Sequence, residues 1–183
     1  MLDQRRSSPS RTLRGPGPNA SEVQQLLNSA LRVPDHGKLV PWRFLSIQGD
    51  ARLALGKLLA QRALELDPNA PNAVIEKDRA RFSFAPLIIT VIARLTPNHK
   101  VPVQEQILSG GAVCFALLQA AQALGFGAQW LTSWAAYDAV ITAKLGVKEN
   151  ERILGFIHIG NVSEAAPERV RPKVEDLLSD LNL

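Results

Sequence analysis

The stretch VQEQILSGGAVCFALLQAAQAL, residues 103–124, decides how this chain folds. It is compatible with a helix along its whole length and is apolar nearly all round, which is typical of a helix buried in the middle of a protein. Two adjacent glycines, Gly110 and Gly111, lie inside it, and each costs about 1 kcal/mol in a helix interior. We therefore expect a partner helix or a flat ligand to approach the helix closely at these glycines.

Hydrophobic periodicity and turn residues place the other elements around this helix. Ser21 and Gln24 predict a capping box that begins a helix, and Pro34 ends its pattern. The apolar run 87–95 is nearly continuous, which predicts a central strand covered on both faces. Further strands are expected over 42–48, 128–132 and 152–160, further helices over 50–66, 72–82 and 137–145, and irregular chain over 1–20.

Length and composition indicate one globular domain over residues 1–183. The chain has 183 residues and is 46% apolar, which is ordinary for a single domain. No period of 20 to 50 residues repeats, so solenoids and propellers are excluded. Helices outnumber strands, and we expect an α+β domain in which helices cover a small sheet around the long central helix.

Cysteine and histidine usage excludes several classes of protein. Cys114 is the single cysteine and cannot form a disulfide within the chain. One cysteine and three scattered histidines offer no metal-ligand spacing, so we expect no metal site. The longest apolar run, 85–93, is short of the ~20 residues that span a bilayer, and no secretory signal follows Met1. We therefore expect a cytoplasmic protein without a membrane partner.

Charge is concentrated at the start of the chain. The net charge is +4, and residues 1–14 contain four arginines against one aspartate. Nucleic-acid binding needs a broad basic face with aromatic platforms, whereas only 5% of these residues are aromatic. A local cluster of this kind favours binding of one small anion such as a phosphate group.

The common catalytic motifs are missing from the sequence. It contains neither glycine-rich nucleotide loop, nor a Gly-x-Ser-x-Gly elbow, nor a Ser-x-x-Lys pair. If the protein is an enzyme, we expect a cofactor to carry its chemistry. Four local features remain, and each also fits a plain structural role: Arg5-Arg6-Ser7-Ser8, the turn 34–38 followed by Pro41-Trp42, the segment Trp130-Leu131-Thr132-Ser133-Trp134, and Arg169 with Arg171.

Six segments, in this order and spacing, resemble the nitroreductase family of FMN-dependent oxidoreductases over essentially the whole chain. They are RRSS (5–8), PDHGKLVPWRF (34–44), APLIITVIA (85–93) with NHKVP (98–102), SGGA (109–112), GFGAQWLTS (125–133) and ILGFIHIG (153–160). The resemblance is closest to the small bacterial branch of minimal-size nitroreductases. It implies an α+β homodimer with a small, mostly antiparallel sheet and two FMN sites at the subunit interface.

The resemblance also implies which residues hold FMN. Arg5, Arg6 and Ser7 would bind its phosphate and ribityl end, and Arg171 would reach the phosphate from late in the chain. The other cofactor-binding positions that it implies are His36 and Val40, contributed by the partner subunit, and Trp130, Leu131 and Thr132, which would line the flavin.

The activity that the resemblance implies is oxidoreductase chemistry. Bound FMN would accept a hydride from NADH or NADPH and pass it to an electron-poor small molecule, such as a nitroaromatic or a quinone, by ping-pong exchange. No side chain need act as a general acid. Two alternatives stay open: a flavin-binding relative with other chemistry, such as dehalogenation or flavin breakdown, and a non-enzymatic interaction module. The rate at which NAD(P)H bleaches the flavin band separates the first alternative from a reductase, and failure to take up FMN would identify the second.

Overall fold

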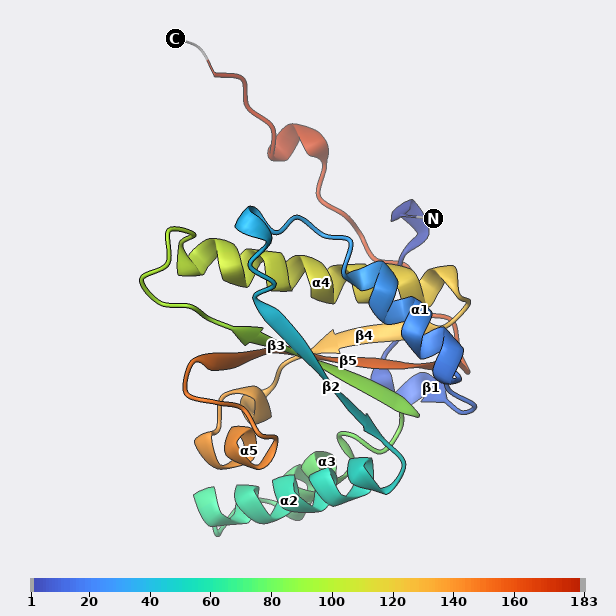
Figure 1. The fold of residues 1–183 in the computed structure, drawn as a ribbon. Helices are drawn as coiled ribbons and strands as arrows, with labels where there is room; N and C mark the ends of the chain where they lie inside the picture. Colours follow the sequence, from blue (N-terminus) through green and yellow to red (C-terminus); the bar gives the residue numbers. More distant parts are fainter. Residues whose placement is uncertain (1, 182–183) are drawn as a thin grey trace.

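An antiparallel sheet forms the centre of the computed structural model, which describes residues 2–181 (Figure 1). β3 (Leu87–Arg94) lies between β2 (Trp42–Gln48) and β5 (Glu151–Val162), and β4 (Gly127–Leu131) pairs with β5 on its other side. Seven of the eight β3 residues are buried. The prediction of a central strand covered on both faces is therefore confirmed.

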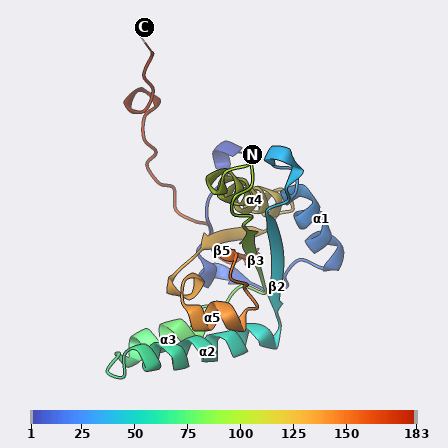
Figure 2. The same ribbon diagram turned by 60° about the vertical axis from the view of Figure 1, so that its left-hand side comes forward.

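Helices cover both faces of this sheet (Figures 1 and 2). α1 (Ala20–Ala30) and α4 (Val103–Ala123) pack on one face, where Leu117 and Ile157 belong to one buried cluster. α2 (Asp50–Leu66), α3 (Asn72–Ala80) and α5 (Ala139–Lys144) lie on the other face. The second cluster lies there, and Leu59 and Phe156 are among its buried members. The α+β class with a small antiparallel sheet, predicted from the sequence, is confirmed.

α4 is buried on one side only, which corrects the expectation of a helix covered all round. Leu108 is 61% exposed and Phe115 is 46% exposed, and both face away from the sheet. Among residues 2–181, α4 is the one helix that is long and apolar enough to cross a membrane by length and composition. Half of that apolar window is buried in the fold, so we interpret α4 as a core helix with one open face.

The two adjacent glycines of α4 have different surroundings. A Cβ at Gly110 would overlap Leu154 Cδ1, so the close approach at this position comes from a side chain of β5. A Cβ at Gly111 would meet no described atom within 4 Å. The expectation of a partner helix or a flat ligand is therefore wrong for Gly110, where a strand residue fills the space. Gly111 lies on the open face of α4.

Three local predictions are corrected by backbone detail. The capping box of α1 uses Asn19 and Glu22, because Asn19 is extended and its side chain reaches the Glu22 amide at 3.0 Å. α5 begins two residues later than expected, since the Asp138 carboxylate caps its first amides after a 3-10 turn, Trp134–Ala136. The first twenty residues are not wholly irregular, because β1 (Leu13–Arg14) pairs with the end of β5 and buries Leu13.

Candidate functional site

The arginine pair near the start of the chain lies beside the beginning of β4. The Ser8 amide donates to the Ala128 carbonyl oxygen at 3.0 Å, and the Ser10 amide donates to Gln129 Oε1 at 2.6 Å. These bonds fix residues 5–8 against the strand. Arg5 and Arg6 are both partly buried there, and Arg5 donates to Ser7 Oγ at 3.3 Å.

Two further arginines reach this place from the segment after β5. Burial, followed by the positive charges of Arg171, Arg6 and Arg169, lowers the pKa of Arg5. Arg5 therefore lies within electrostatic range of Arg6 and of two arginines from the segment after β5. Arg171 is thereby brought to the arginine pair, as the resemblance implies, and Arg169 joins them although it was not among the predicted site residues.

The four arginines have little counter-charge within the described chain. Glu168 forms an ion pair with Arg6 at 3.1 Å, and the Pro167 carbonyl oxygen also accepts from Arg6. Arg6 Nε is buried and has no hydrogen-bond partner among residues 2–181. Guanidinium groups bind phosphate oxygens through paired, charge-assisted hydrogen bonds. The cluster therefore fits a small dianion such as a phosphate group.

The other end of β4 presents aromatic and polar side chains. Trp130 is 38% exposed, and its indole Nε1 donates to the Leu154 carbonyl oxygen at 3.0 Å. The ring lies over Gly155, where a Cβ would overlap it. Leu131 and Thr132 follow and are half-buried. With a rise of about 3.3 Å per residue, Leu131 lies about 10 Å along the strand from Ala128. The start of β4 thus lies beside charged arginines, and its other end presents a flat, partly apolar surface.

One hydrogen bond and one ion pair fasten the chain that follows this strand. The Trp134 indole Nε1 donates to Asp78 on α3 at 3.1 Å, and Asp78 also pairs with Arg81. Asp138 pairs with Arg62 on α2 at 3.1 Å. These contacts hold the 3-10 turn at both ends. The Trp134–Asp78 and Arg62–Asp138 contacts join residues more than fifty positions apart, and nothing local in the sequence indicates them.

The turn that carries His36 and Val40 lies elsewhere, on α4. His36 Nδ1 is 2.6 Å from Glu105 Oε2, and Ser109 Oγ donates to the Pro34 carbonyl oxygen at 2.6 Å. Val40 is 46% exposed and has a positive φ of 51°. The Asp35 carboxylate stabilises this backbone by accepting from the amides of Leu39 and Val40.

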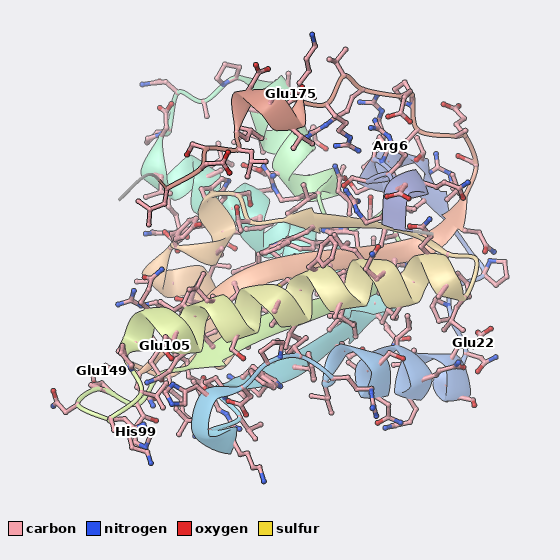
Figure 3. The ribbon with its side chains drawn as sticks, turned by 90° about the horizontal axis from the view of Figure 1, so that it is seen from above. Arg6, Glu22, His99, Glu105, Glu149 and Glu175 are labelled. Carbon is pink, nitrogen blue, oxygen red and sulfur yellow. The ribbon has the colours of Figure 1, made fainter. Side chains whose placement is uncertain are left out.

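Within one chain, this turn and the arginine cluster are far apart. Figure 3 labels Arg6 and Glu105, and they lie toward opposite ends of α4. Because His36 contacts Glu105, it lies with Glu105 and away from Arg6. The structure therefore gathers Arg5, Arg6 and Arg171 at one place, and Trp130 to Thr132 along the adjoining strand, but leaves His36 and Val40 apart from both.

Sequence reasoning missed a cavity on the described surface. Its volume is about 600 Å³, and it lies between the start of α4, α5 and the first half of β5. Leu154, whose carbonyl oxygen accepts from Trp130, is part of its wall. A smaller hollow of about 220 Å³ adjoins Arg6 and Ser8 at the other end of β4.

Comparisons with known proteins show the family of this chain. The sequence model of the nitroreductase family matches residues 2–161. A relative from Escherichia coli K12, named "Putative NAD(P)H nitroreductase YdjA", is 37% identical over 160 residues, which cover 87% of this chain and 85% of the relative.

Solved structures share the same fold. The nitroreductase-like family protein from Bacillus cereus matches with a TM-score of 0.83 at 21% identity, over 98% of this chain and 93% of that one. A nitroreductase from Bacteroides fragilis NCTC 9343, solved with bound FMN, matches with a TM-score of 0.72 at 16% identity, over 99% of this chain and 96% of that one.

Proposed function

The chain belongs to the nitroreductase family, and from that premise we propose that it is an NAD(P)H-dependent FMN oxidoreductase. Its acceptors are small electron-poor molecules, such as nitroaromatics and quinones, and the two substrates react in alternating half-reactions. The observation that carries this proposal is the arrangement along β4. A cluster of four arginines lies at one end of the strand, and Trp130, Leu131 and Thr132 lie at the other.

The residues present fit FMN at both ends of this strand. When bound, FMN supplies the two-electron chemistry that links oxidation of NAD(P)H to reduction of the acceptor. The lowered pKa of Arg5 reflects burial and uncompensated positive charge, which a phosphate dianion would relieve. The partly exposed indole of Trp130 offers an aromatic surface of the kind on which a planar ring packs.

The side chains of this protein bind and orient the cofactor and set the charge around it, and they do not transfer protons. Arg5, Arg6 and Arg171 bind the phosphate, with Ser7 donating or accepting beside them. Gly155 leaves the space that the Trp130 ring occupies, and the Leu154 carbonyl oxygen fixes that ring by its hydrogen bond. No side chain is assigned as a general acid. We keep a cytoplasmic location as a prediction.

We also propose that the protein is a homodimer whose copies share their sites. The open face of α4 exposes Leu108 and Phe115, and exposed apolar patches mark interaction surfaces. The turn with His36 and Val40 borders this face and is distant from the arginines of its own chain. Pairing two copies through α4 would bring each turn to the flavin site of the partner.

Flavin uptake and reduction test this function. We expect the protein to bind FMN, and anaerobic mixing with NADH or NADPH to bleach the flavin band rapidly. Slow bleaching would favour a flavin enzyme of another kind, such as a dehalogenating or flavin-consuming relative. A protein that purifies colourless and fails to take up FMN would be an interaction module, and the proposal would be wrong.

A double variant tests the phosphate role. Arg5→Ala with Arg6→Ala should weaken FMN binding about ten- to a hundredfold for each charge-assisted hydrogen bond lost, since each contributes about 1.5 to 3 kcal/mol. Arg11→Ala with Arg14→Ala is the matched control, because it removes the same charge from exposed positions of the same segment. Equal FMN dissociation constants for the two double variants would exclude the assignment.

A further inference from the structure

A cavity of about 600 Å³ lies beside α5, and Leu154 in its wall accepts the hydrogen bond of the Trp130 indole. Its floor is apolar and includes Ile107, Ala136 and Ile153, and Tyr137 stands at its rim with 75% of its surface exposed. A volume of this size accommodates one small molecule. An apolar floor beside an exposed phenol ring suits a planar aromatic ligand.

This cavity adjoins the aromatic end of β4. Leu154 lines it, and the same residue accepts the hydrogen bond from Trp130 Nε1 at 3.0 Å. Ala136 and Tyr137 line it as well, and they follow Thr132 by only a few residues. A molecule in the cavity would therefore lie next to the surface that we assign to the flavin ring.

The charged lining of the cavity is unbalanced. Glu151 is fully engaged, because Arg43 binds both of its carboxylate oxygens at 2.8 and 2.7 Å and lowers its pKa to about 2. This leaves Lys148 and Arg152 against Glu149. Arg152 is exposed, and its guanidinium has no ion pair or hydrogen bond within residues 2–181. The cavity therefore carries an excess of positive charge that a ligand can use.

We propose that this cavity binds the electron acceptor and that Arg152, together with Lys148, selects planar aromatic acceptors that carry a carboxylate. The inference rests on the proposed function, since it is that function which places a flavin beside Trp130. The apolar floor and Tyr137 hold the ring, and the carboxylate binds the Arg152 guanidinium, whose planar group can donate two parallel hydrogen bonds to a carboxylate. Arg152 is thus a specificity-determining residue.

Two acceptors of equal shape and different charge test the proposal. 4-Nitrobenzoate and neutral 4-nitrobenzamide are compared on the FMN-loaded protein by kcat/KM and by their dissociation constants, measured through quenching of tryptophan fluorescence. We expect the anion to be preferred by about fivefold at low salt, the upper end for an exposed ion pair, and less so at high salt.

Two variants test whether the cavity causes the preference for the anionic acceptor. Arg152→Gln should remove most of the preference for the anion, in binding as well as in turnover. Lys144→Gln is the control, because Lys144 is an exposed cation of α5 that does not line the cavity, and it should leave the preference unchanged. An equal response of both acceptors to Arg152→Gln, or the absence of any preference in the unaltered protein, would overturn the inference.

The nicotinamide cofactor is the other source of anionic groups at this site. If Arg152 serves its phosphates, Arg152→Gln should raise the KM for NADH or NADPH while the ratio between the two acceptors stays constant, and this result also overturns the inference. A failure of the proposed function looks different. In that case FMN is not reduced and neither acceptor is turned over, whereas a failed inference leaves 4-nitrobenzamide and 4-nitrobenzoate turned over equally.

Discussion

The buried imidazole of His158 should make the fold sensitive to mild acid. His158 is 1% exposed on β5, and its ring stacks on Phe82 with centroids 5.5 Å apart. Neither ring nitrogen has a hydrogen-bond partner in the part of the chain that the structure describes. Burial, reinforced by the charge of Arg81, lowers the pKa of His158 to about 4. The substitution His158→Leu removes the titrating group and keeps an apolar side chain of similar volume.

The pKa difference sets the size of the effect. An unfolded histidine titrates near 6.5, so between pH 6.5 and 4 the unfolded chain binds a proton that the folded chain does not. The stability contributed by neutral His158 is complete above pH 6.5 and is lost as the pH falls toward 4. At about 1.4 kcal/mol per pKa unit, this loss is about 2 kcal/mol between pH 7 and pH 5. Glu151 contributes mainly below this window, because its folded pKa is about 2 and it loses stability between pH 4.5 and 2.

Urea unfolding at pH 7, 6 and 5, at fixed protein and FMN concentrations, measures the difference. The free energy of unfolding of His158→Leu should fall by about 2 kcal/mol less than that of the unaltered protein between pH 7 and pH 5. Ile159→Val, at the next position of β5, changes no titrating group, should keep the slope of the unaltered protein and serves as the control. An identical pH slope for His158→Leu and the unaltered protein would refute the reasoning.

Three further substitutions give separate tests. Gly56→Ala should lower the free energy of unfolding by about 1 to 3 kcal/mol, because the new Cβ would overlap the Arg79 carbonyl oxygen where α2 packs on α3; urea titration would detect it, and an unchanged stability would argue against this contact. Gly111→Leu should yield aggregates or monomers that lose FMN, whereas a stable, flavin-loaded monomer of the unaltered protein in sedimentation at micromolar concentration would contradict the dimer. His36→Asn should weaken FMN binding modestly and keep most of the rate of flavin reduction in stopped-flow experiments; a loss of about a hundred- to ten-thousandfold with FMN still bound would make His36 a general acid.

Most elements could be predicted from sequence because their signals are local. The run 87–95 is apolar at nearly every position, and only a strand buried on both faces needs such a pattern, so β3 was placed within one residue. α4 was predicted because residues 103–124 form a long, helix-compatible and mostly apolar stretch. The predicted start of α1 is wrong by two residues because Asn19 and Ser21, two positions apart, are both residues that cap helices. Only the backbone of Asn19, extended with ψ of 174°, decides between them.

The candidate site also contains residues that the sequence predicts and contacts that only the structure shows. Residue types and their order, read against the family resemblance, predict Arg5, Arg6 and Arg171 and the segment Trp130 to Thr132 as site residues, and their role in binding FMN stays a prediction. The addition of Arg169 to the cluster and the contact of His36 with Glu105 required the folded chain.

The sequence by itself determined the periodicity of the elements, the concentration of arginines near the start of the chain and the family to which it is similar, because each of these depends on residue type and short spacing. Only the tertiary structure decided that residues 5 and 6 meet the segment after β5 at one arginine cluster, that α4 keeps an open face and that Leu154, the partner of Trp130, lines a cavity. Arg6 and Glu168 are 162 residues apart, and the meeting of such distant groups is set by the strand order β2-β3-β5-β4 rather than by any local preference.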